Sequence, residues 1–330
     1  MRCLIRADAT VDTGTGHVMR CLTLAEELVA RGHEVHLRGH VGDIPWLHER
    51  LSAVGVRHEE AVAHVLEPRE ADAADYDVAV VDSYEYSPEA VSAMARLVPT
   101  LAIIDGDDRG IVSSLYLDQN LGADDRPGSP LLAGPRFALV RGEIVRRMRV
   151  RPRALSRPPR ILAFMGGSDP TGAILTVAES LARLDAAIAL DIVVTARWRQ
   201  EVARLVGSRP SARLLEPTPR LPELLSEADI TVSATGTSAW EICTVGIPAV
   251  FVAVVDNQLA GFRAITERGI ALGSDLTSAA RPVDDIHDGV LRLLHEPALR
   301  TRLFDASREL FDGRGASRVA DALERLASSV

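Results

Sequence analysis

Short apolar runs alternate with segments of helical period along this sequence, and the alternation starts twice. The first series begins with residues 3–5 and the second with residues 160–165. In each series a run of strand length ends at polar or glycine residues, and a helical segment follows. Because parallel strands need such crossover helices, the pattern predicts an α/β fold with two doubly wound, Rossmann-like domains and an interdomain cleft.

The composition also favours two domains. A chain of 330 residues is long for one core, and 47% of it is hydrophobic although only 4% is aromatic. Between positions 140 and 160 the sequence changes to eight Arg and three Pro without a clear period. We therefore expect an N-terminal domain over residues 1–145, a linker over 146–159 and a C-terminal domain over 160–330. The last helix is a candidate to pack back on the N-terminal domain.

Charge and residue usage exclude several classes of function. The net charge of -9 argues against a nucleic-acid or membrane-surface binder. All 37 basic residues are Arg, so neither a pyridoxal-phosphate lysine nor a P-loop lysine exists. Any phosphate must be held by backbone N–H groups, hydroxyls or Arg.

The cysteines and the apolar runs bear on localisation. Three well-separated Cys are typical of reduced, structural thiols. Residues 1–8 read as a strand with charges at both ends rather than a signal peptide, and no apolar run approaches the ~20 residues of a membrane span. We expect a cytoplasmic protein without stable membrane insertion, either a monomer or a weak dimer.

Residues 233–241, Ser-Ala-Thr-Gly-Thr-Ser-Ala-Trp-Glu, form the strongest candidate binding loop. The stretch follows an apolar run and opens a helix that Gly246 terminates. Free N–H groups and the helix dipole favour a phosphate there, and Glu241, one turn in, can accept hydrogen bonds from a sugar diol. Ser238 and Glu241 also fit a capping box, which needs no ligand. From these residues alone, both interpretations stay open.

A second glycine-containing loop, Gly14-Thr-Gly16-His17, closes the first apolar run at a helix start. It is either a simple turn with a capping His or a site where His17 acts as general base near neutral pH. A dinucleotide fingerprint would need Gly at position 19, where Met19 stands, and an acidic residue after the second strand, where Arg38 stands. A nicotinamide oxidoreductase is therefore disfavoured.

Other polar clusters give weaker signals. Gly166-Gly167-Ser168 is a second strand-to-helix phosphate cradle or a tight turn. Asp105-Gly-Asp107 resembles the Asp-x-Asp of metal-dependent sugar transferases, but the polar loop that continues after it favours a turn. We expect no metal site. The remaining candidates are His33, His36 and His40, which are loosely spaced and have no Cys or carboxylate partner on a helix.

Taken together, the motifs resemble one family. Eight of them occur in order: Arg6-Ala-Asp8, Gly14-x-Gly-His17, Asp82-x-Tyr84, Asp118-Gln-Asn120, Gly134-Pro-Arg136-x-Ala-Leu139, Gly166-Gly-Ser-Asp169, Gly236-Thr-Ser238-x-x-Glu241 and Asp256-Asn-Gln258. The set is similar to that of the PseG/SpsG-type UDP-sugar hydrolases of pseudaminic-acid synthesis and their spore-coat-polysaccharide relatives. Those proteins look like MurG, the lipid-linked cell-wall transferase, and the resemblance implies its GT-B architecture across nearly the whole chain.

The resemblance implies that the chain binds a UDP-sugar donor and a small-molecule acceptor, without a metal or other cofactor. By the family pattern, His17 activates the attacking group, with Tyr84 beside the sugar as the second candidate catalytic residue. The expected UDP-binding residues are Gly166, Gly167, Ser168, Leu215, Thr235, Gly236, Thr237, Ser238 and Glu241. The expected sugar-binding residues are Gly14, Gly16, Asn257 and Gln258.

One departure bears on the reaction. The hydrolases carry Asp-His-Tyr after the third strand, whereas this chain has Asp82-Ser83-Tyr84. The loss of that His favours sugar transfer, as in the related cytosylglucuronate synthases, so we expect an inverting, metal-independent glycosyltransferase with His17 as base. The alternatives are a UDP-sugar hydrolase and a non-catalytic nucleotide-sugar binding protein.

Overall fold

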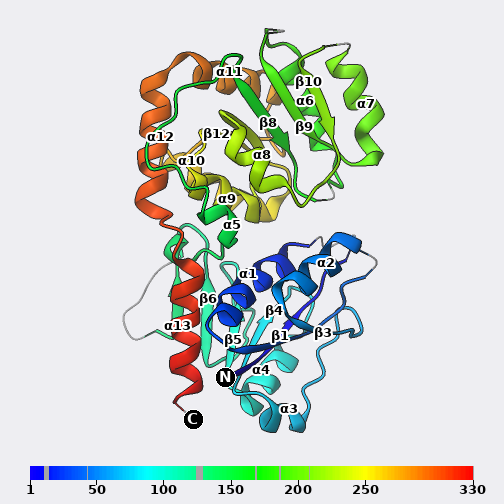
Figure 1. Ribbon diagram of the computed structural model, residues 1–330, viewed down its shortest axis with the longest axis vertical. Coiled ribbons are helices and arrows are strands. Elements are labelled where there is room, and N and C mark those ends of the chain that lie inside the picture. Colours follow the sequence, from blue (N-terminus) through cyan, green and yellow to red (C-terminus); the bar gives the residue numbers. More distant parts are fainter. Residues whose placement is uncertain are drawn as a thin grey trace. The chain divides into compact units, whose positions relative to one another are not determined.

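The chain forms two compact units in the computed structural model, which describes residues 1–10, 15–42, 44–123, 129–167, 169–185, 187–207 and 209–329 (Figure 1). Unit 1 comprises Met1–Gly142 together with Gly313–Val330, and unit 2 comprises Glu143–Asp312. Residues 146–159, which the sequence analysis assigned to a linker, are part of unit 2. The last helix is part of unit 1.

Unit 1 contains a seven-stranded parallel sheet in the order β3-β2-β1-β4-β5-β6-β7. The strands are β1 (Arg2–Ala7), β2 (Glu34–Arg38), β3 (Arg57–Glu59), β4 (Val78–Asp82), β5 (Thr100–Ile103), β6 (Leu115–Asp118) and β7 (Leu131–Ala133). The helices are α1 (Gly16–Ala30), α2 (Pro45–Val54), α3 (Glu70–Asp75), α4 (Pro88–Leu97), the 3-10 turn η1 (Pro135–Phe137) and α13 (Gly315–Ala327). Strands β3 and β7 and helix α3 are too short, at three, three and six residues, for the periodicity of the sequence to indicate them.

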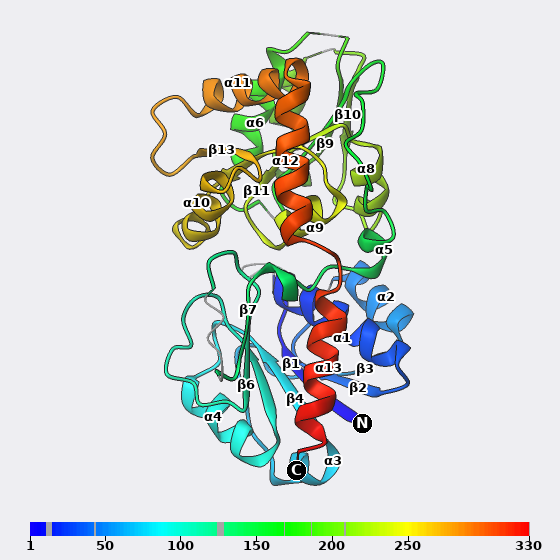
Figure 2. The ribbon, with the colours of Figure 1, turned by 90° about the vertical axis from the view of Figure 1, so that its left-hand side faces the viewer.

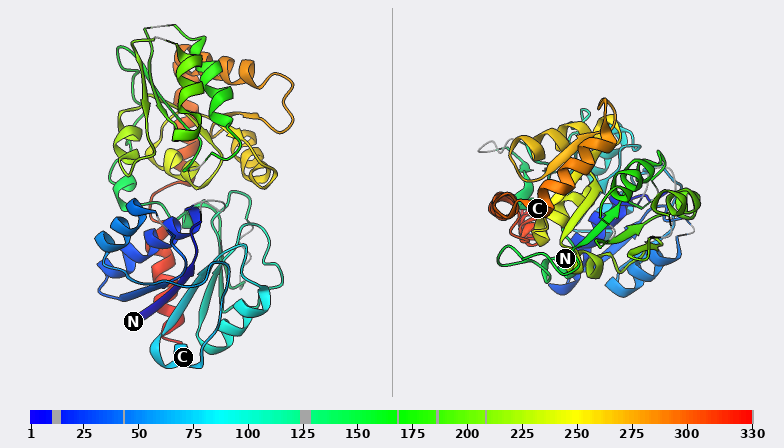
Figure 3. Two further views of the ribbon diagram at one scale, coloured as in Figure 1. Left: turned by 90° about the vertical axis from the view of Figure 1, so that its right-hand side faces the viewer. Right: turned by 90° about the horizontal axis from the view of Figure 1, so that it is seen from above.

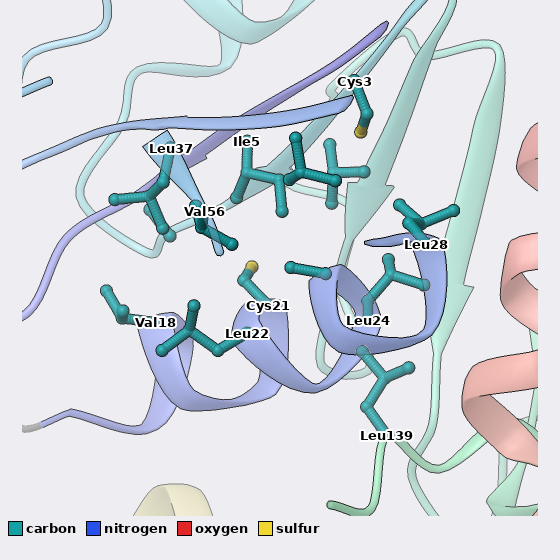
Figure 4. Close-up of a cluster of buried hydrophobic side chains, with 14 of the residues drawn as sticks. Cys3, Ile5, Val18, Cys21, Leu22, Leu24, Leu28, Leu37, Val56 and Leu139 are labelled. Carbon is teal, nitrogen blue, oxygen red and sulfur yellow. The ribbon is translucent and has the colours of Figure 1, made fainter. Parts of the chain in front are cut away.

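The apolar face of α1 fixes this helix on the sheet (Figure 4). Val18, Cys21 and Leu28 are fully buried against the β1 side chains of Cys3 and Ile5. Burial of each large aliphatic side chain contributes about 1.5–3 kcal/mol. This packing determines where the first turn of α1 lies, and that turn begins at the carboxyl end of β1.

Helix α13 returns the chain to unit 1, where it packs beside α1 and η1 (Figure 2). Arg31, just after α1, donates to Asp321 Oδ1 at 2.7 Å and to the Ser317 carbonyl at 3.0 Å. Gly315 begins the helix against the Ala138 carbonyl, so closely that a Cβ at position 315 would lie 2.1 Å from that oxygen. Helix α13 can therefore pack in this position only if residue 315 is glycine.

Unit 2 contains a six-stranded parallel sheet in the order β10-β9-β8-β11-β12-β13. The strands are β8 (Arg160–Phe164), β9 (Ala189–Val193), β10 (Ala212–Leu215), β11 (Ile230–Ala234), β12 (Ala249–Ala253) and β13 (Leu272–Asp275). The helices are α5 (Gly142–Val145), α6 (Ala173–Ala182), α7 (Ala196–Val206), α8 (Leu221–Glu227), α9 (Thr237–Val245), the 3-10 turn η2 (Asp256–Gln258), α10 (Leu259–Glu267), α11 (Pro282–His295) and α12 (Pro297–Leu310). Strand β13 ends in Gly-Ser-Asp, which hides its strand character in the sequence.

The Arg-rich segment before β8 is not a free connection, because it caps helix ends of unit 2. Arg149 donates its backbone N–H to Val245 O at 3.0 Å and its guanidinium to Ala228 O, while Arg153 donates to Ser226 O at 3.0 Å. These carbonyls end α8 and α9, where the helix dipole favours cations. Sequence composition alone made these arginines look like a solvated crossing.

Both sheets have the same order for their first six strands, and each has helices on both faces (Figure 3). In each sheet the order reverses between the first and fourth strands, β1 and β4 in unit 1 and β8 and β11 in unit 2. Doubly wound sheets bind ligands at the carboxyl ends of strands beside this switch point. No helix in the described part of the chain is both long and apolar enough to cross a membrane.

We predict that Gly315→Ala loosens α13, because the added methyl group displaces the helix from Ala138. The cost of overpacking is about 1–3 kcal/mol, so amides of α13 should exchange with deuterium about tenfold faster. Gly261→Ala is the control, since a Cβ there meets nothing within 4 Å. Unchanged exchange in Gly315→Ala would contradict the tight contact.

Candidate functional site

The carboxyl ends of β1 and β4 bring His17 and Asp82 together in unit 1. Asp82 is the last residue of β4 and is fully buried, and its Oδ1 lies 2.7 Å from His17 Nδ1. Arg20, one turn further along α1, donates Nε to Asp82 Oδ2 at 2.5 Å and Nη2 to Oδ1 at 2.6 Å. A histidine, a carboxylate and a guanidinium therefore form one buried polar group.

The groups around Asp82 decide its protonation state. Burial alone would raise the pKa of Asp82, but the charge of Arg20 and the hydrogen bonds from Arg20 and His17 outweigh it and hold that pKa well below its usual range. A carboxylate cannot donate, so His17 Nδ1 carries the proton that Asp82 accepts. The neutral imidazole then has its lone pair on Nε2, the arrangement a general base requires.

Arg20 also pairs with Asp105, which follows β5. Its Nη1 and Nη2 donate to the two carboxylate oxygens of Asp105 at 3.1 and 2.9 Å. Burial opposes ionisation of Asp105, but Arg20 holds the pKa of this carboxyl below its usual value. Asn120 Nδ2 donates to Asp105 Oδ1 at 2.8 Å and to Asp118 Oδ1 at 3.0 Å, which extends the network to the end of β6.

Tyr84 completes this site from the loop after β4. Its hydroxyl donates to Asp105 Oδ2 at 2.5 Å, and its ring meets the His17 ring edge-on, with centroids 4.6 Å apart at 84°. Burial and the charge of Asp105 raise the pKa of the Tyr84 phenol, so it remains a hydrogen-bond donor. The structure thus brings together the two residues predicted as catalytic, His17 and Tyr84.

Sequence reasoning missed Arg20 and misread Asp105 as part of a simple turn. Arg20 is a lone charge on the buried face of α1, three residues after His17 and next to Cys21. A buried charge in an apolar stripe implies a carboxylate partner, and that was the available signal. Within the described residues, no group of three His, Cys, Asp or Glu side chains is arranged to hold a metal.

In unit 2, α9 presents its N-terminus beside the switch point between β8 and β11. The helix begins at Thr237 with Gly236 as its N-cap, so Ser238 is inside the first turn and the predicted capping box does not form. Gly236 and Thr237 are exposed and Ser238 is half-buried, whereas residues 239–245 are all buried. Neither hydroxyl has a protein partner in the part of the chain that the structure describes, so both can face a ligand.

Some of the remaining predicted residues of unit 2 lie at the carboxyl edge of its sheet, and others lie in the protein interior. Leu215 ends β10 at the same sheet edge, but Thr235 donates its hydroxyl to Val252 O at 3.1 Å. Gln258 accepts the Val254 N–H at 3.0 Å. Glu241 is buried in the second turn of α9. Asn257 lies in η2. In unit 1, Gly16 begins α1. The predicted sites at Gly14 and Ser168 lie outside the described residues.

The second predicted phosphate cradle, after β8, has only part of the expected geometry. Gly166 adopts φ +82, and both it and Gly167 are exposed. However, α6 does not follow this turn directly, because it begins only at Ala173. The Asp169 carboxylate accepts the N–H groups of Ala173 and Ile174 at 3.0 and 3.1 Å. Because an acidic side chain occupies this helix end, α6 is a poor anion site compared with α9.

Comparison with known proteins agrees with this architecture. No family model matches the chain. The spore coat polysaccharide biosynthesis protein SpsG of Bacillus subtilis is 25% identical over 341 aligned positions, which cover 98% of this chain and 97% of SpsG. The chain is similar to SpsG along almost its whole length. The predicted PseG/SpsG-type resemblance is therefore confirmed.

Solved structures establish the GT-B fold. The kitacinnamycin glycosyltransferase superposes with a TM-score of 0.71 at 20% identity, covering 98% of both chains. MurG of Acinetobacter baumannii gives a TM-score of 0.71 at 15% identity, covering 98% of this chain and 99% of MurG. The structure of MnaA from S. aureus with UDP also gives 0.71, at 12% identity, covering 100% of this chain and 98% of MnaA. The chain thus has the predicted MurG-like fold.

We predict that Asp82→Asn destabilises the protein in a pH-dependent way. Loss of one partner of a buried ion pair costs about 3–5 kcal/mol at pH 7. The folded pKa of Asp82 lies below its unfolded value, so its contribution is present above about pH 4 and is lost as the pH falls.

Melting temperatures of the wild type and Asp82→Asn should therefore differ most at neutral pH, begin to approach each other below about pH 4 and converge only at still lower pH. Asp75→Asn is the control, since its carboxylate is 62% exposed and lies 3.9 Å from Arg2. A difference that stays constant with pH would show that the ionised Asp82 contributes nothing.

Proposed function

We propose that this protein is a glycosyltransferase that uses a UDP-sugar donor and that His17 is its general base. The observation that carries the proposal is the 2.7 Å contact between His17 Nδ1 and a carboxylate held ionised by Arg20. It leaves Nε2 as the proton acceptor at the carboxyl edge of the first sheet, where doubly wound folds bind ligands. The GT-B fold supports the same class of reaction.

The reaction that fits these residues is a single displacement. Nε2 of His17 takes the proton of an acceptor hydroxyl or amine while the acceptor attacks the anomeric carbon and the bond to the diphosphate breaks. Asp82 stabilises the imidazolium that forms, and UDP leaves with the electron pair of the broken bond. One displacement inverts the configuration at the anomeric carbon. Tyr84 supports the orientation of the His17 ring.

The donor is proposed to bind through unit 2. The first turn of α9 offers backbone N–H groups and the hydroxyls of Thr237 and Ser238 to the diphosphate, and its dipole offsets the charge of the leaving group. This supports a reaction without a metal, which should continue in excess EDTA. The bound UDP in the MnaA structure supports a uridine nucleotide. Further contacts are proposed for Gly166, Gly167, Ser168, Leu215 and Glu241 with UDP, and for Gly14, Gly16, Asn257 and Gln258 with the sugar.

Hydrolysis of the same donor is the second candidate. The His17–Asp82 pair can deprotonate water as well as an acceptor group, and nothing in its geometry requires an acceptor of particular structure. Incubation with a panel of UDP-sugars and no acceptor distinguishes the reactions. Full turnover to free sugar indicates hydrolysis, slow release indicates transfer, and UDP binding with no product under any acceptor indicates a binding protein.

His17→Ala should lower turnover about 100-fold or more, because proton removal from the attacking group then relies on solvent. UDP affinity, measured by calorimetry, should stay nearly unchanged because the proposed UDP contacts belong to unit 2. His295→Ala, an exposed position on α11, is the control. Wild-type turnover in His17→Ala would remove His17 from the mechanism.

Thr237→Val and Ser238→Ala should each weaken UDP binding by about 0.5–1.5 kcal/mol, because each removes one hydrogen bond to the ligand. Neither should lower the melting temperature, since Gly236, not a hydroxyl residue, caps α9. Thr235→Val is the matched control. Its hydroxyl is bonded to Val252 O, so its loss should affect stability and leave UDP affinity unchanged. The reverse pattern would place the diphosphate elsewhere.

A further inference from the structure

Tyr84 occupies a loop that has little support of its own. The loop joins β4 to α4, and Tyr84 is 52% exposed. Within the loop, Glu85 donates its N–H to Ser83 Oγ at 3.0 Å. Yet Tyr84 meets the His17 ring and donates to Asp105, two contacts that require a fixed backbone.

Arg109 supplies that support from the neighbouring loop after β5. Its Nη2 donates to Ser83 O at 2.8 Å, and its Nη1 donates to Tyr84 O and, at 3.4 Å, to Tyr86 O. One planar guanidinium thus joins three carbonyl oxygens of the β4–α4 loop. Lysine has a compact ammonium group and lacks the planar fork that fits such an arrangement.

The backbone at Arg109 is held in an unfavourable conformation. Its φ is +54°, in the left-handed region that non-glycine residues rarely adopt. The turn around it is fixed because Asp107 Oδ1 accepts the Arg109 N–H at 2.9 Å and Asp108 Oδ1 accepts the Gly110 N–H at 2.8 Å. This conformation directs the guanidinium to the β4–α4 loop, and the same turn begins at Asp105.

We propose that Arg109 is a positioning residue for the reaction. It holds the backbone of Tyr84 so that the phenol reaches Asp105 and the ring packs on His17, which sets the direction of His17 Nε2. The catalytic part of this inference rests on the proposed function. The structural part, the coupling of Arg109 to the His17 ring through Tyr84, stands on the contacts alone.

The test compares Arg109→Gln, Arg109→Lys, Tyr84→Leu and the double variant Arg109→Gln/Tyr84→Leu. In the full-length protein, NMR of the His17 ring nitrogens should show the same displacement in Arg109→Gln and Tyr84→Leu. The double variant should add little, because residues that act through one contact are not additive. Arg109→Lys should give an intermediate displacement. Arg96→Gln, exposed on the last turn of α4, is the control and should match the wild type.

Kinetics with the UDP-sugar that gives the highest turnover provide the second measurement. In Arg109→Gln, kcat should fall about tenfold or more while KM for the donor changes less than about twofold, the pattern for loss of an interaction made in the transition state. Wild-type His17 signals in Arg109→Gln, or additive displacements in the double variant, would overturn the coupling. If His17→Ala keeps full turnover, the proposed function fails while the NMR comparison still decides the role of Arg109.

Discussion

The bidentate ion pair between Arg20 and Asp82 is the interaction on which the site in unit 1 depends. It joins the first turns of α1 to the end of β4, across the switch point of the sheet. A buried charge of either sign alone would be costly, and each one makes the other tolerable. His17 bonds to Asp82 and Asp105 bonds to Arg20, so both extend this pair. The imidazole is therefore anchored at the end of β4, and Tyr84 from the β4–α4 loop packs on its ring.

The two units use similar sheets in different ways. At the switch point of unit 1, side chains form a network with a histidine at its border. At that of unit 2, the candidate site consists mainly of backbone and hydroxyl groups at the start of α9. Helix α9 is buried along the rest of its length, and Trp240 stacks on Phe311 behind it with ring centroids 5.5 Å apart. A rigid helix end suits a fixed anionic group, since its N–H groups need no rearrangement when the ligand arrives.

Much of this structure could be predicted from the sequence, because apolar period and polar strand ends are local signals. They located most strands and helices, the doubly wound topology and the loops that carry His17, Tyr84 and Gly236. Long-range pairing was not accessible in this way. Nothing local shows that Arg20 meets Asp105. The linker was misread for the same reason, because arginines that cap α8 and α9 have the composition of a solvated segment.

The chain passes from unit 1 to unit 2 after Gly142 and returns at Gly313, so unit 2 is an insertion within unit 1. During vectorial synthesis on the ribosome, residues 143–312 emerge as an uninterrupted segment with all six of their strands. The earlier-made unit must wait for α13, whose contacts with Arg31 and Ala138 come from residues translated after unit 2. The second unit is thus able to complete its fold first, and the half that carries the histidine becomes whole only after Gly315–Ala327 has left the ribosome.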